Sequence, residues 1–320
     1  MGVLKNTFSW SFSAANDFEK CQRKRYWNKY GKWGGWDRNA DPIQKKAYQL
    51  DKIDNLYSIL GNAVEMAAMH ILRLHQNGQT CSAEDAYNQV AKDYLNKSWI
   101  ESKKMQWKTN PKKYCCLHEH YYNTISKDKE EEITANMVAR TKKCLSNFHD
   151  KTLPRIANIT PEMEIAVDVP GRQSDAEHFL YEGIKIYAIP DYCYRKDHVI
   201  HIHDWKSGRQ RDSHRDQLAV YGLWAACKHQ RPDESLCVYV EYLKDGEVVV
   251  ASLTPEDLER VKERIGQSVA DMTEMLVDAD RERNKPLPKK DWELALDTTT
   301  CRHCNFFELC EGELKEVGLI

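Results

Sequence analysis

Two β-like runs with only a short polar stretch between them constrain the fold of this chain more than any other feature. They cover residues 184–194 and 199–206, and the polar residues lie at 195–198. Strands joined this closely are expected to be neighbours in one sheet. The segment that follows, residues 212–227, has the apolar spacing of a helix. The sequence therefore predicts an α/β fold with a mixed sheet flanked by helices.

The patterning of the remaining chain divides it into three parts. Residues 1–155 are mainly helical, residues 156–285 alternate between strands and helices, and residues 286–320 form a cysteine-rich tail. Caps, breakers and apolar spacing predict individual elements. They are a helix around residues 13–26, one or two helices over 42–72, helices over 82–94 and 118–148, strands over 162–169 and 178–181, a hairpin of 237–243 with 247–253, and a helix from 255 to about 283.

Composition excludes several broad classes of protein. The formal net charge is −2, so any nucleic acid must be bound by a local basic surface rather than by the field of the whole protein. No apolar run approaches the length of a membrane span, and the first residues lack the apolar core of a signal peptide. Eleven cysteines without an export signal indicate the reducing cytoplasm.

An acidic and basic constellation stands on the two β-like runs. Because side chains alternate along a strand, Asp204 and Lys206 share one face, and Asp191 can meet them from the neighbouring strand. Two carboxylates suit a hard cation such as Mg²⁺ or Mn²⁺, and the lysine can orient water or stabilise developing charge. Gln217 and Tyr221 lie four residues apart on one helix face and can hold the lysine, the water or a phosphate.

An Asp-x-Lys triplet on a strand is common and alone says little. The ordered set of five residues in a strand–strand–helix context favours a catalytic site over a solvated strand. The chain resembles the PD-(D/E)xK nuclease superfamily, specifically its RecB-like branch. The resemblance rests on Ile-Pro-Asp at 189–191, Asp-Trp-Lys at 204–206 and Gln-Leu-Ala-Val-Tyr at 217–221. It implies a restriction-endonuclease-like α/β core and metal-dependent cleavage of DNA.

The RecB-like branch usually also has Gly-x-x-x-His on an earlier helix, where the histidine binds the metal. This chain has Gly61 followed four residues later by Glu65, so the resemblance implies that a carboxylate replaces the histidine. Glu164, on a predicted strand before Asp191, is the second candidate for the third acidic ligand. The backbone carbonyl of Trp205 is a further candidate ligand.

Three cysteines in the tail form a second candidate site. Cys301, Cys304 and Cys310 supply thiolates, which select zinc or an iron–sulfur cluster. Cys21, on the predicted N-terminal helix, is the best fourth ligand. Iron–sulfur members of the branch, the AddB-like and CRISPR-adaptation nucleases, place one cysteine before the core and three after it, which implies a [4Fe-4S] cluster here. Zinc and incidental buried cysteines remain the alternatives.

These features together predict a metal-dependent deoxyribonuclease, an exonuclease or end-processing enzyme on single-stranded DNA or DNA ends, in repair, recombination or defence. Arg209, Arg211 and Arg215 are candidate phosphate contacts, and a solvated helix start is their alternative. A noncatalytic DNA-binding or scaffolding subunit and an RNA-directed nuclease are the rival functions. No Gly-rich phosphate loop is present in the sequence, so unwinding would require a separate helicase or another subunit of a complex.

Overall fold

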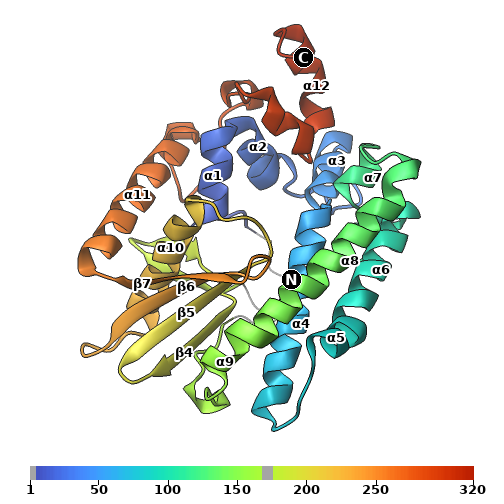
Figure 1. Ribbon diagram of the computed structural model, residues 1–320. Helices are drawn as coiled ribbons and strands as arrows, with labels where there is room; N and C mark the ends of the chain where they lie inside the picture. The colour runs from blue at the N-terminus through green and yellow to red at the C-terminus, as the bar shows by residue number, and fades with distance from the viewer. Residues whose placement is uncertain (1–4, 168–175) are drawn as a thin grey trace.

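The computed structural model describes residues 5–167 and 176–320, which form a mixed α/β structure with two sheets (Figure 1). The larger sheet has the order β4 (Tyr192–Lys196), β5 (Val199–Lys206), β6 (Ser235–Tyr242) and β7 (Glu247–Leu253). The smaller sheet has the order β1 (Ser9–Ser11), β3 (Ile184–Tyr187) and β2 (His178–Tyr181). The predicted α/β class with a mixed sheet is confirmed.

The larger sheet combines antiparallel and parallel pairs. β4 is antiparallel to β5, and β7 is antiparallel to β6, so both short connections predicted from the sequence are confirmed. β5 and β6 are parallel, which requires a crossover, and the chain makes it through α10 (Ser213–Lys228). The turn between β6 and β7 contains Gly246 at a φ of +69°, a conformation that glycine adopts without strain.

Two strand predictions before β5 are wrong. Residues 184–194 are not one strand, because β3 and β4 belong to different sheets and the chain changes direction at residues 188–191. Pro190 lies in this break and has no N–H to offer to a sheet. Residues 162–167 form a 3₁₀ turn and one isolated bridge between Glu164 and Tyr194 instead of a strand. The last two residues of the predicted strand, 168 and 169, lie outside the described residues.

Most of the first half is helical, as expected. Its main helices are α3 (Pro42–Asp51), α4 (Leu56–Gln76), α6 (Lys92–Lys103) and α8 (Glu130–Asn147). α4 packs against α6 and α8 in an apolar core that also contains Trp205 and Tyr192, so it covers the face of the sheet opposite α10. Each fully buried Leu or Ile in such a core contributes about 1.5–3 kcal/mol. The predicted helix over 118–148 is interrupted, because eight residues separate the end of α7 (His118–Tyr121) from the start of α8.

The N-terminal segment belongs to the core of the sheet region. β1 pairs in parallel with β3, and Trp10, Phe12 and Phe18 join the apolar core beneath α10. The predicted single helix is two helices, α1 (Phe12–Lys20) and α2 (Gln22–Tyr26). Cys21 lies between them in an extended conformation, with a φ of −164°. The expectation that this cysteine lies within a helix is therefore wrong.

The C-terminal segment differs from expectation at two places. α11 (Pro255–Glu274) begins at the predicted cap Thr254 but ends before the expected residue 283. The chain then turns back, with Asp278 at a φ of +59° and a bridge between Leu276 and Pro286. The tail contains an unpredicted helix, α12 (Phe307–Glu316). It packs on the N-terminal segment, where the guanidinium of Arg23 forms an ion pair with Glu313.

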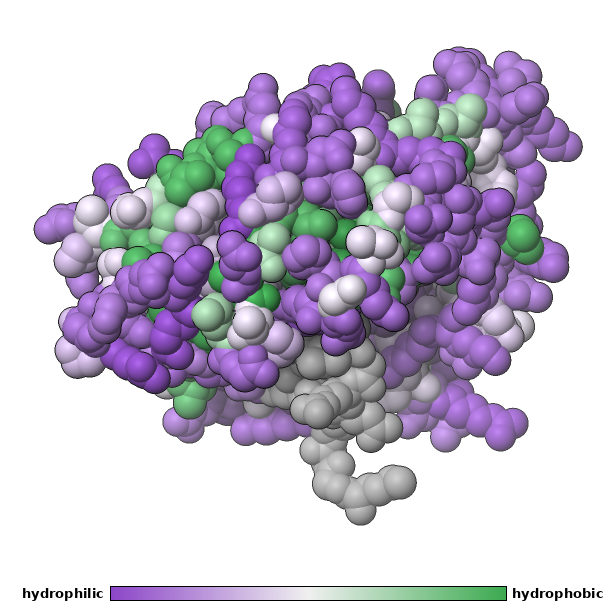
Figure 2. Space-filling view, turned by 60° about the horizontal axis from the view of Figure 1, so that its bottom comes forward, coloured by the Kyte–Doolittle hydropathy of each residue, from purple (hydrophilic) through white to green (hydrophobic). Residues whose placement is uncertain are grey.

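The outer surface is mostly polar. Figure 2 shows one face on which hydrophilic residues predominate and hydrophobic residues form separate groups between them. Among the described residues, no helix has both the length and the apolar character that crossing a membrane requires.

Candidate active site

A chain of polar contacts runs from β5 to α10. Asp204 and Lys206 point to the α10 side of the sheet, and the Lys206 ammonium lies 2.9 Å from Oδ1 of Asp204. The same ammonium donates to Oε1 of Gln217 at 3.1 Å. Nε2 of Gln217 in turn donates to the hydroxyl of Tyr221 at 2.8 Å. The structure thus brings four of the predicted catalytic residues into one hydrogen-bonded chain.

Asp191 enters the same group from the start of β4. Its backbone N–H donates to the carbonyl of His203 at 3.1 Å, which continues the antiparallel pairing of β4 and β5. Its Oδ2 accepts a hydrogen bond from the backbone N–H of Trp205. This pairing turns the Asp191 carboxylate towards Asp204. Trp205 also lines the cavity in front of these carboxylates, where its backbone could contribute a ligand.

Glu65 completes an acidic cluster from a different part of the chain. It lies on α4, and its carboxylate is close enough to interact electrostatically with Asp204, Asp191 and Lys206. One turn earlier, Gly61 faces Ser207, the residue that follows β5. The cleft between α4 and residues 207–211 has a volume of about 320 Å³.

Burial and mutual repulsion change the acidity of the cluster. Burial, reinforced by Asp204 and then Glu65, raises the pKa of Asp191 well above its ordinary value, and Lys206 opposes this shift only in part. Burial also raises the pKa of Asp204, and burial together with Asp204 raises the pKa of Glu65. Three carboxyl groups therefore share one ammonium. Additional positive charge at this place would stabilise their ionised forms.

Comparison with known protein families identifies a match for this chain. The family model described as the PD-(D/E)XK nuclease superfamily matches residues 9–311. The chain belongs to this superfamily. Its members are nucleases, which hydrolyse phosphodiester bonds. The match extends from β1 to α12 and so includes all five residues of the constellation, which lie directly before β4, on β5 and on α10. A search of curated proteins gives no match.

The donor set fits the ions that PD-(D/E)XK nucleases typically use, Mg²⁺ and Mn²⁺. Glu65, Asp191 and Asp204 offer only oxygen atoms, which hard divalent cations prefer. Within residues 5–167 and 176–320, no three Asp, Glu, His or Cys side chains are oriented to share one ion. At this site Lys206 is bonded to Asp204, and the Trp205 N–H is bonded to Asp191.

Glu164, the other predicted candidate for the third acid, lies elsewhere. Its carboxylate accepts hydrogen bonds from Gln76 at 2.7 Å and from the Tyr192 hydroxyl at 3.0 Å, and it forms an ion pair with Arg73. These partners hold it outside the acidic cluster. Glu65 is therefore the acid that the fold brings to Asp191 and Asp204.

The three candidate arginines divide between two cavities of the nuclease. Arg209 and Arg211 line the cleft beside the carboxylates, whereas Arg215 lines a larger cavity on the other side of Arg211. All three are exposed. Within the described part of the chain, none of them forms an ion pair with an acidic side chain.

Sequence reasoning missed residues that shape the cleft. Arg140 of α8 donates two hydrogen bonds, of 3.0 and 2.6 Å, to the carbonyl of Ser207, and its guanidinium lies 5.4 Å from the ring centre of Tyr57. His214 on α10 contacts the Tyr242 hydroxyl at 3.2 Å. Burial, with the nearby charges of Lys206 and Arg211, lowers the pKa of His214 to about 4. No sequence motif marks these residues.

The four candidate cysteines lie near one another at the junction of the tail and the N-terminal helices. Cys21 interacts electrostatically with Cys301, Cys304 and Cys310. Burial raises the pKa of Cys304 to about 12 and that of Cys310 to about 11.

Hydrogen-bond donors surround these sulfur atoms. The backbone N–H of Lys24 donates to the sulfur of Cys21 at 3.3 Å. The indole N–H of Trp27 is buried beside Cys310, and its interaction with the sulfur partly offsets the rise in the pKa of that thiol. Four cysteine sulfur atoms with nearby N–H donors suit a sulfur-rich metal cluster, whose sulfur atoms accept such hydrogen bonds.

Proposed function

We propose that this PD-(D/E)XK protein is a Mg²⁺- or Mn²⁺-dependent deoxyribonuclease that degrades or trims single-stranded DNA or DNA ends. The observation that carries the proposal is the convergence of Glu65, Asp191 and Asp204 around the ammonium of Lys206, which Gln217 holds. Such a group serves no purpose in packing, since bringing three mutually repelling carboxyl groups together, with Asp204 buried, destabilises the fold. A noncatalytic scaffold would have no need of it.

Each residue of the site has a role in this reaction. Glu65, Asp191, Asp204 and the backbone carbonyl of Trp205 would hold the divalent ion. When bound, the ion polarises the scissile phosphate and lowers the pKa of a coordinated water molecule.

The remaining residues act on the phosphate and on one another. Lys206 stabilises the negative charge that develops on the phosphate oxygens, and the Gln217–Tyr221 pair fixes the position of its ammonium. Arg209 and Arg211 contact the flanking phosphates. In this proposal, the divalent ion and the Lys206 ammonium act on the phosphate from the same cleft.

The dimensions of the cleft support a single strand as the substrate. A space of about 320 Å³ between α4 and residues 207–211 is comparable in size to one nucleotide rather than to a length of duplex. Because the net charge of the chain is −2, the protein as a whole does not attract DNA. Its contacts with DNA therefore depend on local arginines. We place such an enzyme in the cytoplasm, in repair, recombination or defence, with a helicase or another subunit supplying unwound strands.

We further propose that Cys21, Cys301, Cys304 and Cys310 bind a [4Fe-4S] cluster. The soft donor set and the buried indole N–H of Trp27 support it. The role of the cluster is structural, because it ties the C-terminal tail to the N-terminal helices. Protein purified without oxygen should be brown and should absorb visible light. A colourless protein with one zinc per chain would refute the iron–sulfur assignment.

The decisive experiment for the nuclease is cleavage of end-labelled single- and double-stranded DNA with Mg²⁺, Mn²⁺ or EDTA. Wild-type protein should cleave the single strand only with a divalent ion, and Lys206→Ala should lose at least about a hundredfold in rate. Lys92→Ala changes an exposed lysine of α6 and serves as the matched control. Equal cleavage by wild type and Lys206→Ala would eliminate the catalytic assignment. Preferential cleavage of RNA in a competition assay would redirect the proposal to RNA.

A further inference from the structure

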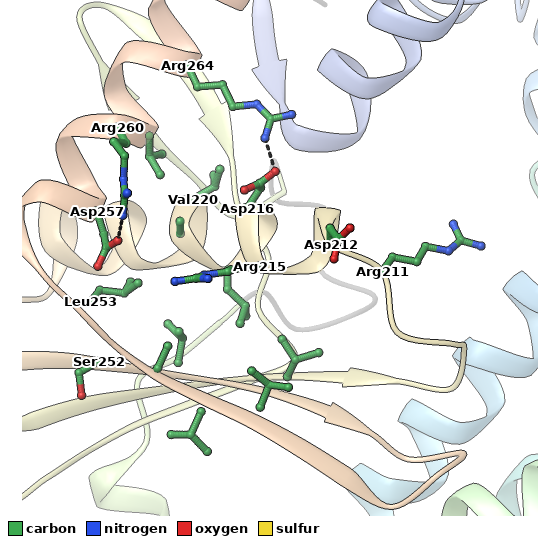
Figure 3. Close-up of a pocket in the computed structure, with 18 of the residues that line it drawn as sticks. Arg211, Asp212, Arg215, Asp216, Val220, Ser252, Leu253, Asp257, Arg260 and Arg264 are labelled. Atoms are coloured by element: carbon green, nitrogen blue, oxygen red, sulfur yellow. Dashed lines mark hydrogen bonds and ion pairs between the residues drawn. The ribbon is translucent and has the colours of Figure 1, made fainter.

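A large cavity lies next to the proposed active site and has no role in the reaction described above. It has a volume of about 840 Å³ and opens between α10, α11 and the β6–β7 hairpin (Figure 3). Its floor is apolar and includes Val238, Val240 and Val249. Val249 is 41% exposed and is accessible to a ligand, whereas Val238 and Val240 lie buried behind it.

The cavity adjoins the catalytic cleft. Arg211 lines both spaces. In the sheet, Asp204 pairs with Val240, which pairs with Val249, so the floor lies beside the catalytic carboxylate on the same face. With neighbouring strands about 4.8 Å apart, Val249 is roughly 10 Å from Asp204. A nucleotide directly next to the scissile phosphate would therefore reach the cavity.

A pair of side chains marks the boundary between the two spaces. His214 lines the catalytic cleft, Tyr242 lines the larger cavity, and Nδ1 of the histidine lies 3.2 Å from the tyrosine hydroxyl. The two spaces are therefore neighbours that share a wall of two side chains, with Arg211 at the passage between them.

The rim of the cavity has unbalanced positive charge. Asp216 forms an ion pair with Arg264 at 2.5 Å, and Asp257 forms one with Arg260 (Figure 3). Arg215 is drawn alongside the cavity floor in Figure 3, and it has no acidic partner within the described residues. Arg211 has no acidic partner there either, and the only other charged group on the rim is Asp212. An anionic ligand with an apolar part fits this combination.

We propose that this cavity binds the unpaired nucleotide adjacent to the scissile bond. The base lies against the valine floor, and the phosphates contact Arg211 and Arg215. This inference rests on the proposed nuclease function and specifies its substrate. A base that enters a cavity between a sheet and two helices cannot remain paired, so the cavity selects single strands. The proposal also predicts that the protein contacts the DNA strand on the far side of the cleaved bond.

The test measures binding separately from cleavage. A fluorescein-labelled 20-nucleotide oligo-dT is titrated with protein in Ca²⁺ at several salt concentrations, and a gel verifies that the oligonucleotide stays intact. Arg215→Ala removes the phosphate contact, and Val249→Glu places a negative charge on the apolar floor. The matched controls are Arg231→Ala and Val317→Glu, which alter exposed residues of the same types outside the cavity.

Both cavity variants should bind the 20-mer about tenfold more weakly, whereas both controls should bind it like wild type. The slope of log affinity against log salt should decrease by about 0.7 in Arg215→Ala, as expected for one lost phosphate contact on a single strand. The preference for the single strand over the same strand in a duplex should also decrease in both variants. Wild-type affinity in either variant would overturn the proposal.

Hydrolysis of a short p-nitrophenyl thymidine phosphodiester tests the catalytic proposal independently. This substrate is too short to extend into the larger cavity. If wild-type protein does not hydrolyse it or any DNA, the nuclease function fails, while the titration still decides whether the cavity binds a nucleotide.

Discussion

Lys206 at the end of β5 donates a hydrogen bond of 3.1 Å to Oε1 of Gln217 in the second turn of α10. This bond ties β5 to the helix that follows it. The amide has a second contact, since its Nε2 donates to the hydroxyl of Tyr221. Gln217 therefore sets where the ammonium lies without itself facing the carboxylates.

The first prediction concerns this positioning. Gln217→Ala should lower kcat by about tenfold to a hundredfold and change KM little, because a displaced ammonium affects the transition state more than substrate binding. Tyr221→Phe removes only the hydroxyl that supports the amide and should lower kcat less. Steady-state cleavage of end-labelled single-stranded DNA measures both. An unchanged kcat in Gln217→Ala, or a fall in its thermal stability that matches the loss of rate, would contradict a positioning role.

The second prediction concerns the buried carboxylates in protein stripped of metal. The pKa of Asp191 is raised in the folded state by burial and by Asp204, so the folded state binds this proton more tightly than the unfolded state. The stability that this group confers therefore decreases as pH rises from about 3.8, its ordinary value, through the raised value. Asp191→Asn removes this dependence. In EDTA, the variant should melt at a higher temperature than wild type near neutral pH, and the difference should shrink towards pH 4.

A thermal melt across pH 4–8 tests this second prediction. The difference between variant and wild type is the relevant quantity, because Glu241 has a pKa lowered chiefly by His203 and contributes with the opposite sign in both proteins. Asp245→Asn is the control, since this exposed turn residue precedes Gly246 and Asn-Gly suits the turn equally well. Mn²⁺ should stabilise wild type and the control but not Asp191→Asn. A variant that melts below wild type at pH 7 in EDTA would refute the electrostatic account.

The third prediction concerns the contact that Arg140 on α8 makes with Ser207. Arg140 donates two hydrogen bonds to the carbonyl of Ser207, directly before the loop that carries Arg209 and Arg211. Arg140→Ala should raise KM for single-stranded DNA several-fold with a smaller effect on kcat, because the loop arginines lose their fixed position. Arg140→Lys keeps the charge but not the paired donors, and it should restore activity only in part. Lys143→Ala, an exposed change on the same helix, should have no effect.

Local pattern was sufficient to predict the central part of the site. Alternation along β5 places Asp204 and Lys206 on one face, and the spacing of Gln217 and Tyr221 places both on one face of α10. The hairpin of β6 and β7 followed from its Asp-Gly turn. Each of these inferences depends on residues close together in sequence, where the backbone period alone determines direction.

Features that depend on distant parts of the chain were not predictable in the same way. The third acid had two candidates, and only the packing of α4 against the sheet brings Glu65 rather than Glu164 to the cluster. β1 pairs with β3, which follows it by more than 170 residues in the sequence. Arg140 contacts Ser207 from a helical segment without a recognised motif. Tertiary packing decides these contacts, and no local periodicity encodes it.

The last prediction concerns the cysteines. Cys21 lies between α1 and α2, where an extended backbone and the N–H of Lys24 orient its sulfur, and it faces three cysteines from the tail. Cys21→Ala should lose most of the bound iron and the visible absorption, because a cluster needs all four thiolates for stable binding. The tail should then detach, which limited proteolysis near residues 290–300 would detect, and the protein should melt at a lower temperature. Cys227→Ala changes an exposed cysteine on α10 and should retain iron, colour and stability. Equal iron content in the two variants would show that Cys21 is not a ligand, even if the nuclease remains active.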